Sequence, residues 1–149
     1  MNIGVILSRC QPLHKGHIEM INRALAENDK VLFIIGSADK SGTERNPFPI
    51  GYRISMLKFA LSFVKDKNRV DYMILNDWSS LVSAWFPKSL RNRITIVSYP
   101  RIDDISSSSI RKAIIENYEA YVEKCIPYWQ GVRLRNMMKR YKSILNKED

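Results

Sequence analysis

The sequence predicts a single α/β domain: an open parallel sheet with helices on both faces, followed by a helical C-terminal portion. Short apolar runs alternate with segments of helical length, which is typical of a parallel sheet with crossover helices. From Ser106 onward the pattern is helical almost to the end. The 149 residues are about the size of one domain and contain no linker or repeat. We therefore expect one domain over 1–149, helical from about 106 to 146.

Four apolar runs predict strands, over residues 2–7, 30–35, 69–75 and 93–97. The first two are continuously apolar, so we expect those strands to be buried on both faces of the sheet. The last two give weaker versions of the same signal.

Helices are expected over residues 17–27, 50–64 and 79–90. In the first, Ile18, Ile21 and Leu25 recur at helical spacing. In the second, apolar residues follow an i, i+4, i+7 pattern from Ile50 to Val64. The third is a weaker prediction, because a proline falls inside it.

The charge balance predicts an anionic partner. There are 24 Lys and Arg residues against 15 Asp and Glu, a formal net charge of +9. A field of that sign attracts nucleic acid, a membrane surface or a phosphorylated small molecule, and composition does not choose among them. The same composition, 45% hydrophobic and 26% charged, excludes collagen-like, mucin-like and long disordered chains.

Cysteine usage and the N-terminal apolar run predict a cytoplasmic protein. Cys10 and Cys125 lie too far apart in the sequence to suggest a metal knuckle or a disulfide framework, so we expect reduced thiols. The apolar run over residues 3–7 is too short for an export signal, and no run is long enough to span a bilayer. We therefore expect no membrane association.

Basic and hydroxyl side chains follow three of the predicted strands. They occupy the loops over residues 8–17, 37–49 and 99–109, and include Arg9, Lys40 and Arg45. Ligands of open parallel sheets bind beyond the carboxyl ends of the strands, where all three loops should open. The sequence therefore predicts a polyanion site at that edge.

His14 and His17 flank the start of the first predicted helix. A helix N-terminus offers unpaired N–H groups to a phosphate, Gly16 leaves room for a ligand to approach the backbone, and imidazoles can donate to phosphoryl oxygens. A metal site would need further ligands, but these are the only histidines and no carboxylate lies beside them, so we expect no protein-held metal. Histidines that cap a helix or pack in the core remain an alternative.

Four serines, Ser106 to Ser109, precede Arg111 at the start of a predicted helix. An ordinary helix cap explains one serine, whereas four with an arginine one turn later favour phosphate binding. Arg111 is the strongest candidate, because a guanidinium binds phosphate through two hydrogen bonds. Asp103 and Asp104 either bind ribose hydroxyls, orient Arg111 or are solvated. No nucleophile–base pair stands out, which favours direct displacement at phosphorus.

Three segments resemble nicotinamide-nucleotide adenylyltransferases of the HxGH nucleotidyltransferase superfamily. Residues 8–17 (SRCQPLHKGH) resemble the signature GRFQPxHxGH, with Ser8 and Cys10 in place of its Gly and Phe. Segments between residues 36 and 54 resemble GSA…NPFTxGER, and residues 105–111 resemble ISSTxIR. The three matches occur in the family's order.

The resemblance implies a Rossmann-like fold of the nucleotidyltransferase type and adenylyl transfer from ATP to nicotinamide mononucleotide, giving NAD and pyrophosphate. It implies that Mg²⁺ arrives with ATP. The catalytic residues expected from it are His14, His17 and Arg111. The nucleotide-binding residues expected from it are Arg9, Gln11, Lys40, Arg45, Ser107 and Ser108.

Three alternatives stay open. The acceptor could be another phosphomonoester such as phosphopantetheine, because the family's nicotinamide-stacking aromatic has no clear match and Trp78 and Trp85 are only nearby candidates. A nucleotide-binding regulator without turnover is the second. The third is nucleic-acid binding by the basic segment 133–142, which we do not expect because such stripes are usually solvated helix faces. A homo-oligomer is also open.

Overall fold

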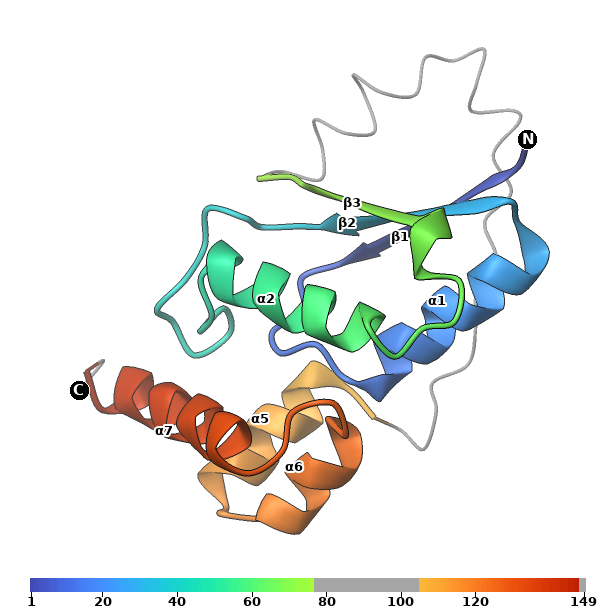
Figure 1. Ribbon diagram of the computed structural model, residues 1–149. Coiled ribbons are helices and arrows are strands. Elements are labelled where there is room, and N and C mark those ends of the chain that lie inside the picture. The colour runs from blue at the N-terminus through green and yellow to red at the C-terminus, as the bar shows by residue number, and fades with distance from the viewer. Residues whose placement is uncertain (77–104, 148–149) are drawn as a thin grey trace.

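The structure, a computed structural model, describes residues 1–76 and 105–147. A parallel sheet of three strands in the order β1–β2–β3 carries two helices, and three further helices form the C-terminal portion (Figure 1). The first half contains β1 (Ile3–Ser8), α1 (Lys15–Glu27), β2 (Lys30–Ile35), α2 (Ile50–Leu61), the 3₁₀ turn η1 (Lys67–Arg69) and β3 (Val70–Ile74). The second contains α5 (Ser107–Ile115), α6 (Glu119–Cys125) and α7 (Val132–Lys147). The predicted helix over 79–90 and strand over 93–97 lie outside the described residues.

The sheet places the carboxyl ends of its strands at one level. Ser8 pairs with Ile35, and Ile35 pairs with Ile74. The helices α1 and α2 connect successive strands and lie on the same face of the sheet (Figure 1). The predicted α/β class and parallel sheet are confirmed, but the helices described here cover only one face of it.

This one-sided cover corrects the prediction for β1. Ile6 is buried, whereas Ile3, Val5 and Leu7 are 55%, 45% and 49% exposed, because no helix of the described part covers their face. In β2, by contrast, Phe33 is buried on one face and its neighbour Ile34 on the other, as predicted.

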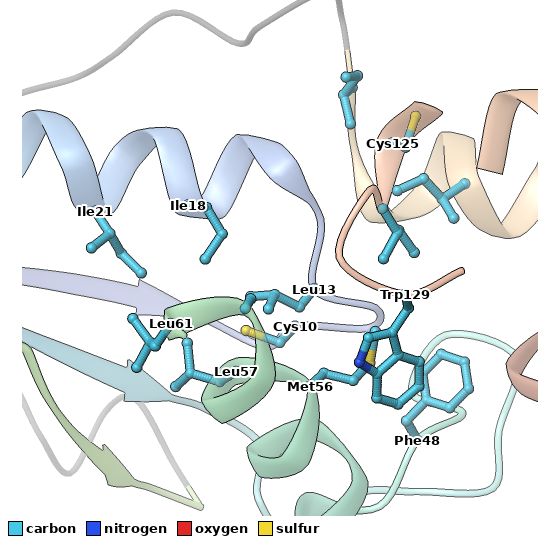
Figure 2. Close-up of a cluster of buried hydrophobic side chains, with 14 of the residues drawn as sticks. Cys10, Leu13, Ile18, Ile21, Phe48, Met56, Leu57, Leu61, Cys125 and Trp129 are labelled. Atoms are coloured by element: carbon cyan, nitrogen blue, oxygen red, sulfur yellow. The ribbon is translucent and has the colours of Figure 1, made fainter. Parts of the chain in front are cut away.

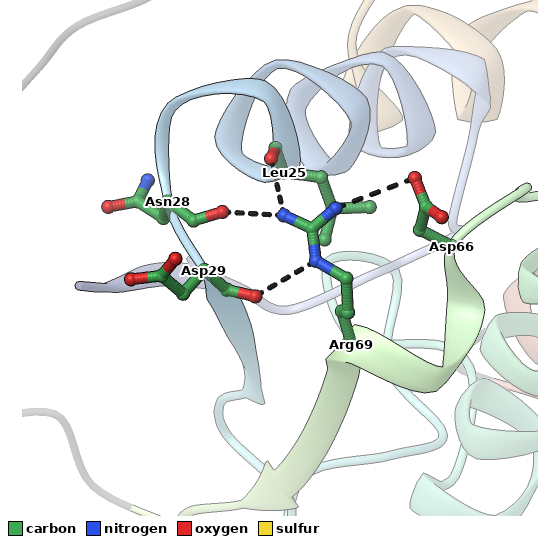
Figure 3. A network of polar contacts seen from close by, with 5 residues as sticks. All are labelled: Leu25, Asn28, Asp29, Asp66 and Arg69. Carbon is green, nitrogen blue, oxygen red and sulfur yellow. Dashed lines mark hydrogen bonds and ion pairs between the residues drawn. The ribbon is translucent and has the colours of Figure 1, made fainter. Parts of the chain in front are cut away.

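The first helix buries the predicted face, and an arginine from elsewhere in the chain donates hydrogen bonds to the carbonyls at its C-terminal end. Ile18, Ile21 and Leu25 are buried, as their spacing predicted. The last turn of α1 contains no basic residue, and its free carbonyls instead accept hydrogen bonds from Arg69 (Figure 3). The Arg69 guanidinium also lies 3.5 Å from the Asp66 carboxylate, which orients it.

The second helix is shorter than predicted, but most of the predicted apolar stripe is buried. It ends at Leu61 rather than Val64, with Ser62 at its C-cap. Its buried face contains Leu57 and Leu61 of that stripe, and the wholly buried Arg53 lies beside them. Side chains from α1 and α2 meet beneath the sheet, and Trp129 extends the same apolar cluster toward the C-terminal portion (Figure 2).

The C-terminal portion is helical, as predicted, but it is divided into three helices. Asn117 and Gly131 adopt left-handed backbone conformations, with φ of 57° and 62°, at the two breaks. None of the helices in the described ranges has both the length and the apolarity needed to cross a membrane.

Part of the basic face of α7 has a structural task. The Arg133 guanidinium lies 4.6 Å from the centre of the Phe59 ring, and that of Arg140 lies 5.0 Å from the centre of the Tyr52 ring. Both rings belong to α2, so these cations help to hold α7 against it. Lys142 donates a hydrogen bond to the side-chain oxygen of Asn117. The basic stripe is therefore not simply a solvated face.

Candidate active site

A cavity of about 310 Å³ lies at the carboxyl end of β1. Its walls come from the end of β1, the loop after it, the start of α1 and the start of α5. Among the side chains that line it are Ser8, Arg9, His14, His17, Ser107 and Arg111. A second cavity of about 330 Å³ adjoins it, sharing Ser108 and Arg111 and adding Arg45 and Lys112. The loops that were predicted to form an anion site therefore border two neighbouring cavities that share Ser108 and Arg111.

Two imidazoles begin α1 in a reciprocal cap. The Nδ1 atom of His14 accepts a hydrogen bond from the backbone N–H of Gly16 at 3.1 Å. The backbone N–H of His14 donates to Nδ1 of His17, also at 3.1 Å. Because each Nδ1 is an acceptor, a neutral ring carries its proton on Nε2. The capping alternative is therefore correct, and it leaves the opposite nitrogen of each ring as a donor.

The His17 ring is held neutral. Only 8% of the residue is exposed, and its ring centre lies 3.9 Å from that of His14. Burial, and then the neighbouring His14, lower the pKa of His17 well below its usual 6.5. Its Nε2 lies 2.8 Å from Oγ of Ser8. At neutral pH, His17 is thus a fixed hydrogen-bond donor at the floor of the cavity.

Acidification is expected to destabilise the folded protein through His17. The folded-state pKa is lower than the unfolded one, so below about pH 6.5 the unfolded chain binds this proton more readily and stability falls. Urea unfolding at about pH 7 and about pH 5 measures the effect. The His17→Asn variant should show a weaker loss between these pH values, and an identical loss in both proteins would contradict the assignment.

The structure gives Gly16 a role beyond the one predicted. A Cβ at this position would lie 2.8 Å from Cε1 and 2.9 Å from Nδ1 of the His14 imidazole. Glycine is therefore required because the His14 ring folds back over the helix start. Gly16 also lines the main cavity, so the prediction that it leaves room for a ligand stays a prediction.

Gly16→Ala is expected to displace the His14 ring and lower both stability and turnover, although alanine is the better helix former. The matched change Gly51→Ala, where a Cβ meets no atom within 4 Å, should instead stabilise α2 by up to about 1 kcal/mol. Thermal unfolding and initial rates of both variants decide the matter. Stabilisation by both substitutions would show that the His14 ring does not depend on Gly16.

Three guanidinium groups converge on the paired cavities. Burial first, and then the positive charges of Arg45 and Arg111, lower the pKa of Arg9. Arg111 donates from Nη1 to the carbonyl of Gln11 at 2.7 Å and from Nη2 to Oγ of Ser108 at 3.3 Å. Mutual repulsion among such charges is relieved when an anion binds between them. Arg9, Arg45 and Arg111 are therefore placed as the sequence predicted.

The serines at the start of α5 make different contacts and have different roles. Ser106 caps α5 and exchanges hydrogen bonds with Ser109, at 3.0 and 3.1 Å. The Ser107 hydroxyl donates to the carbonyl of Pro12 at 2.8 Å, which ties α5 to the first loop. Ser108 is exposed at the junction of the two cavities, beside Arg111. The N-terminus of α5 thus faces the same space as that of α1.

Two predicted nucleotide-binding residues sit differently from the rest. Gln11 lines the cavity, but its amide nitrogen donates to the Phe48 carbonyl at 3.1 Å and its oxygen accepts from the Phe48 N–H at 2.8 Å. This side chain joins the loops after β1 and β2. Lys40 is exposed and lines neither cavity.

Arg53 is the residue that sequence reasoning missed. It is 0% exposed, and its guanidinium donates to backbone carbonyls in both loops, among them Arg9 at 3.0 Å and Gly36 at 2.9 Å. The available signal was a single arginine set among the apolar residues of the predicted second helix. Asn46, which belongs to the loop predicted to border the site, accepts a hydrogen bond from Arg9 at 3.3 Å.

The remaining candidate residues concern metal binding, acceptor binding and nucleophilic catalysis. Across residues 1–76 and 105–147, no group of three His, Cys, Asp or Glu side chains could hold a metal ion. The remaining candidates, Trp78, Trp85, Asp103 and Asp104, lie outside the described residues. Cys10 is buried, and burial raises the pKa of its thiol to about 12, which makes it a poor nucleophile.

Comparison with solved structures supports the fold. A crystal structure of a bifunctional NMN adenylyltransferase/ADP ribose pyrophosphatase from Francisella tularensis, complexed with AMP and a manganese ion, matches with a TM-score of 0.72 at 20% identity. The match covers 99% of this chain and 52% of that one. The chain therefore has the Rossmann-like fold of nucleotidyltransferases.

Sequence comparison identifies the family. Residues 9–79 match the cytidylyltransferase-like family model. The nicotinamide-nucleotide adenylyltransferase of Thermoplasma acidophilum is 39% identical over 140 residues, covering 89% of this chain and 73% of that protein. The Pyrococcus abyssi enzyme of the same name is 32% identical, covering 90% and 88%, while the match to that of Saccharolobus solfataricus spans 55% of its length at 34% identity. With a site built from two helix starts and converging arginines, this similarity shows that the chain belongs to the nicotinamide-nucleotide adenylyltransferase family.

Proposed function

We propose that the protein transfers the adenylyl group of ATP to nicotinamide mononucleotide, releasing NAD and pyrophosphate. The observation that carries the proposal is the convergence of two imidazoles, three guanidinium groups and two helix N-termini on one pair of cavities. Relatives named for this activity align with most of the chain.

The reaction needs positioning and charge stabilisation more than it needs a base. A phosphate oxygen of nicotinamide mononucleotide forms a bond to the α-phosphorus of ATP, while the bond from that phosphorus to the bridging oxygen of pyrophosphate breaks. The attacking phosphate is already ionised, so no side chain has to remove a proton. His14 and the hydrogen-bonded pair of His17 and Ser8 stabilise charge on the transferring phosphoryl group from the start of α1.

The adjoining cavity suits the leaving group. Arg111 lies between the two cavities, and Arg45 and Lys112 line only the second. With the α-phosphate beside His17, the β- and γ-phosphates would extend past Arg111 toward Arg45. These cations then offset the charge that gathers on pyrophosphate as it leaves.

Magnesium fits this site as an ion carried by ATP. Glu19 is the one carboxylate among the described residues that line the main cavity, and it lies 3.6 Å from Arg23, one turn along α1. The protein therefore supplies few oxygen ligands, and phosphate oxygens would supply most of them. When bound, the ion would neutralise triphosphate charge.

The test is a product assay with purified protein, ATP and Mg²⁺. Nicotinamide mononucleotide should give equal amounts of NAD and pyrophosphate, whereas phosphopantetheine should give neither dephospho-coenzyme A nor pyrophosphate. The second acceptor is included because no described aromatic side chain has been assigned to nicotinamide. Tight ATP binding without product from either acceptor would indicate a nucleotide-binding regulator instead.

A further inference from the structure

Ser8 occupies an unusual position at the end of β1. It is the last residue of the strand, lines the main cavity and contacts His17. The signature that this loop resembles has glycine here, so Ser8 adds a hydroxyl where that signature has no side chain. Its neighbour Cys10 adopts a left-handed backbone conformation, with φ of 54°, which turns the chain sharply away from the strand.

The hydrogen bonds around Ser8 fix the direction of its own proton. His17 accepts from the backbone of His14 at Nδ1, so its Nε2 carries the proton and donates to Oγ of Ser8 at 2.8 Å. The backbone N–H of Cys10 also donates to this oxygen, at 3.2 Å. With two donors on its two lone pairs, Oγ directs its own O–H elsewhere. The Cys10 thiol, at 3.7 Å, is a further weak donor to the same oxygen.

We propose that the Ser8 hydroxyl contacts the substrate directly, donating to a phosphoryl oxygen of the bound nucleotide, and that His17 acts on the phosphate through Ser8. The identity of the nucleotide rests on the proposed function. The chain of donors runs from Nε2 of His17 to Oγ of Ser8 and on to the phosphoryl oxygen. No proton is transferred, and the hydrogen bond from His17 to Ser8 polarises the one from Ser8 to the phosphoryl oxygen.

A structural role must be separated from this one, because the same oxygen holds the turn at Cys10. If the hydroxyl only holds the turn, removing it should lower stability and activity together, and the loss should not depend on whether His17 is present. A substrate donor affects turnover more than stability, and its effect depends on His17. The two roles therefore differ in both stability and coupling.

The experiment compares Ser8→Ala, Ser8→Thr and the control Ser62→Ala, which removes an exposed hydroxyl after α2 that donates to the Phe59 carbonyl. Ser8→Ala removes both the contact of Ser8 and the effect of His17 that passes through it, so it should lower kcat/KM at least as much as His17→Asn, by about 100-fold or more. Ser8→Thr should recover most of this loss, and Ser62→Ala should behave as wild type. Melting temperatures are measured on every variant.

The coupling is tested by combining Ser8→Ala with His17→Asn. If His17 acts through Ser8, the double variant should be no slower than Ser8→Ala alone, because removing Ser8 already removes the contribution of His17. Full additivity of the two losses, or unchanged kcat/KM in Ser8→Ala, overturns the proposal. So does a loss of activity that only follows a loss of folded protein.

Failure of the proposed function gives a different result. Wild-type protein that makes no NAD refutes that function but leaves the Ser8 contact to be decided by calorimetry with ATP. Ser8→Ala should then bind ATP several-fold more weakly than Ser62→Ala. Equal affinities overturn the contact with the phosphate.

Discussion

His17→Asn is expected to lower kcat for NAD formation by about 100-fold to 1000-fold, the usual cost of removing one transition-state donor. Asparagine can place its side-chain oxygen near the position of Nδ1 and keep the hydrogen bond from the His14 backbone, so the start of α1 stays capped. It does not reach Ser8, so the donor formed by Nε2 is lost. Turnover should therefore fall much further than stability.

Pyrophosphate release at saturating substrates gives kcat, and thermal unfolding gives the stability of the same samples. Asn22→Ala, an exposed change on the same helix, serves as the control and should alter neither. His17→Ala should lose both turnover and the cap, which separates the two tasks of the ring. A His17→Asn protein with normal kcat would remove His17 from the reaction.

Local sequence patterns were sufficient to predict the buried face of α1 and the edge of the sheet at which the basic loops meet. Hydrophobic spacing reports which face of a helix is buried, so Ile18, Ile21 and Leu25 could be placed from sequence. The rule for parallel sheets then directed the basic loops to one edge, and Arg9 and Arg45 do converge with Arg111.

Long-range partners could not be read in this way. The amide of Gln11 is a plausible phosphate ligand until Phe48, 37 residues later, is found to occupy both of its polar atoms. The exposure of Val5 depends on which helices cover each face, a tertiary property that a continuous apolar run does not encode. Periodicity also assigns charged residues to the solvent, which is why Arg53 was overlooked.

Arg53→Met is expected to cause the largest loss of stability of any change considered, about 3 kcal/mol or more in the free energy of unfolding. The guanidinium is wholly buried and donates to five backbone carbonyls in the loops after β1 and β2, those of Arg9, Gly36, Ser37, Ala38 and Lys40. Methionine fills similar space but offers no donor, so carbonyls shielded from water lose their partner.

Arg69→Met is the matched control, because Arg69 also donates to backbone carbonyls, those of Leu25, Asn28 and Asp29. These carbonyls lie at the C-terminal end of α1, far along the helix from His14, and Arg69 is partly exposed. Arg69→Met should therefore destabilise less and leave KM for ATP unchanged. Arg53→Met should also raise KM for ATP, because the two loops that it joins hold Arg9 and Arg45. Urea unfolding and ATP titrations of both variants measure these differences, and an equal KM in the two would show that the loops keep their arrangement without the buried guanidinium.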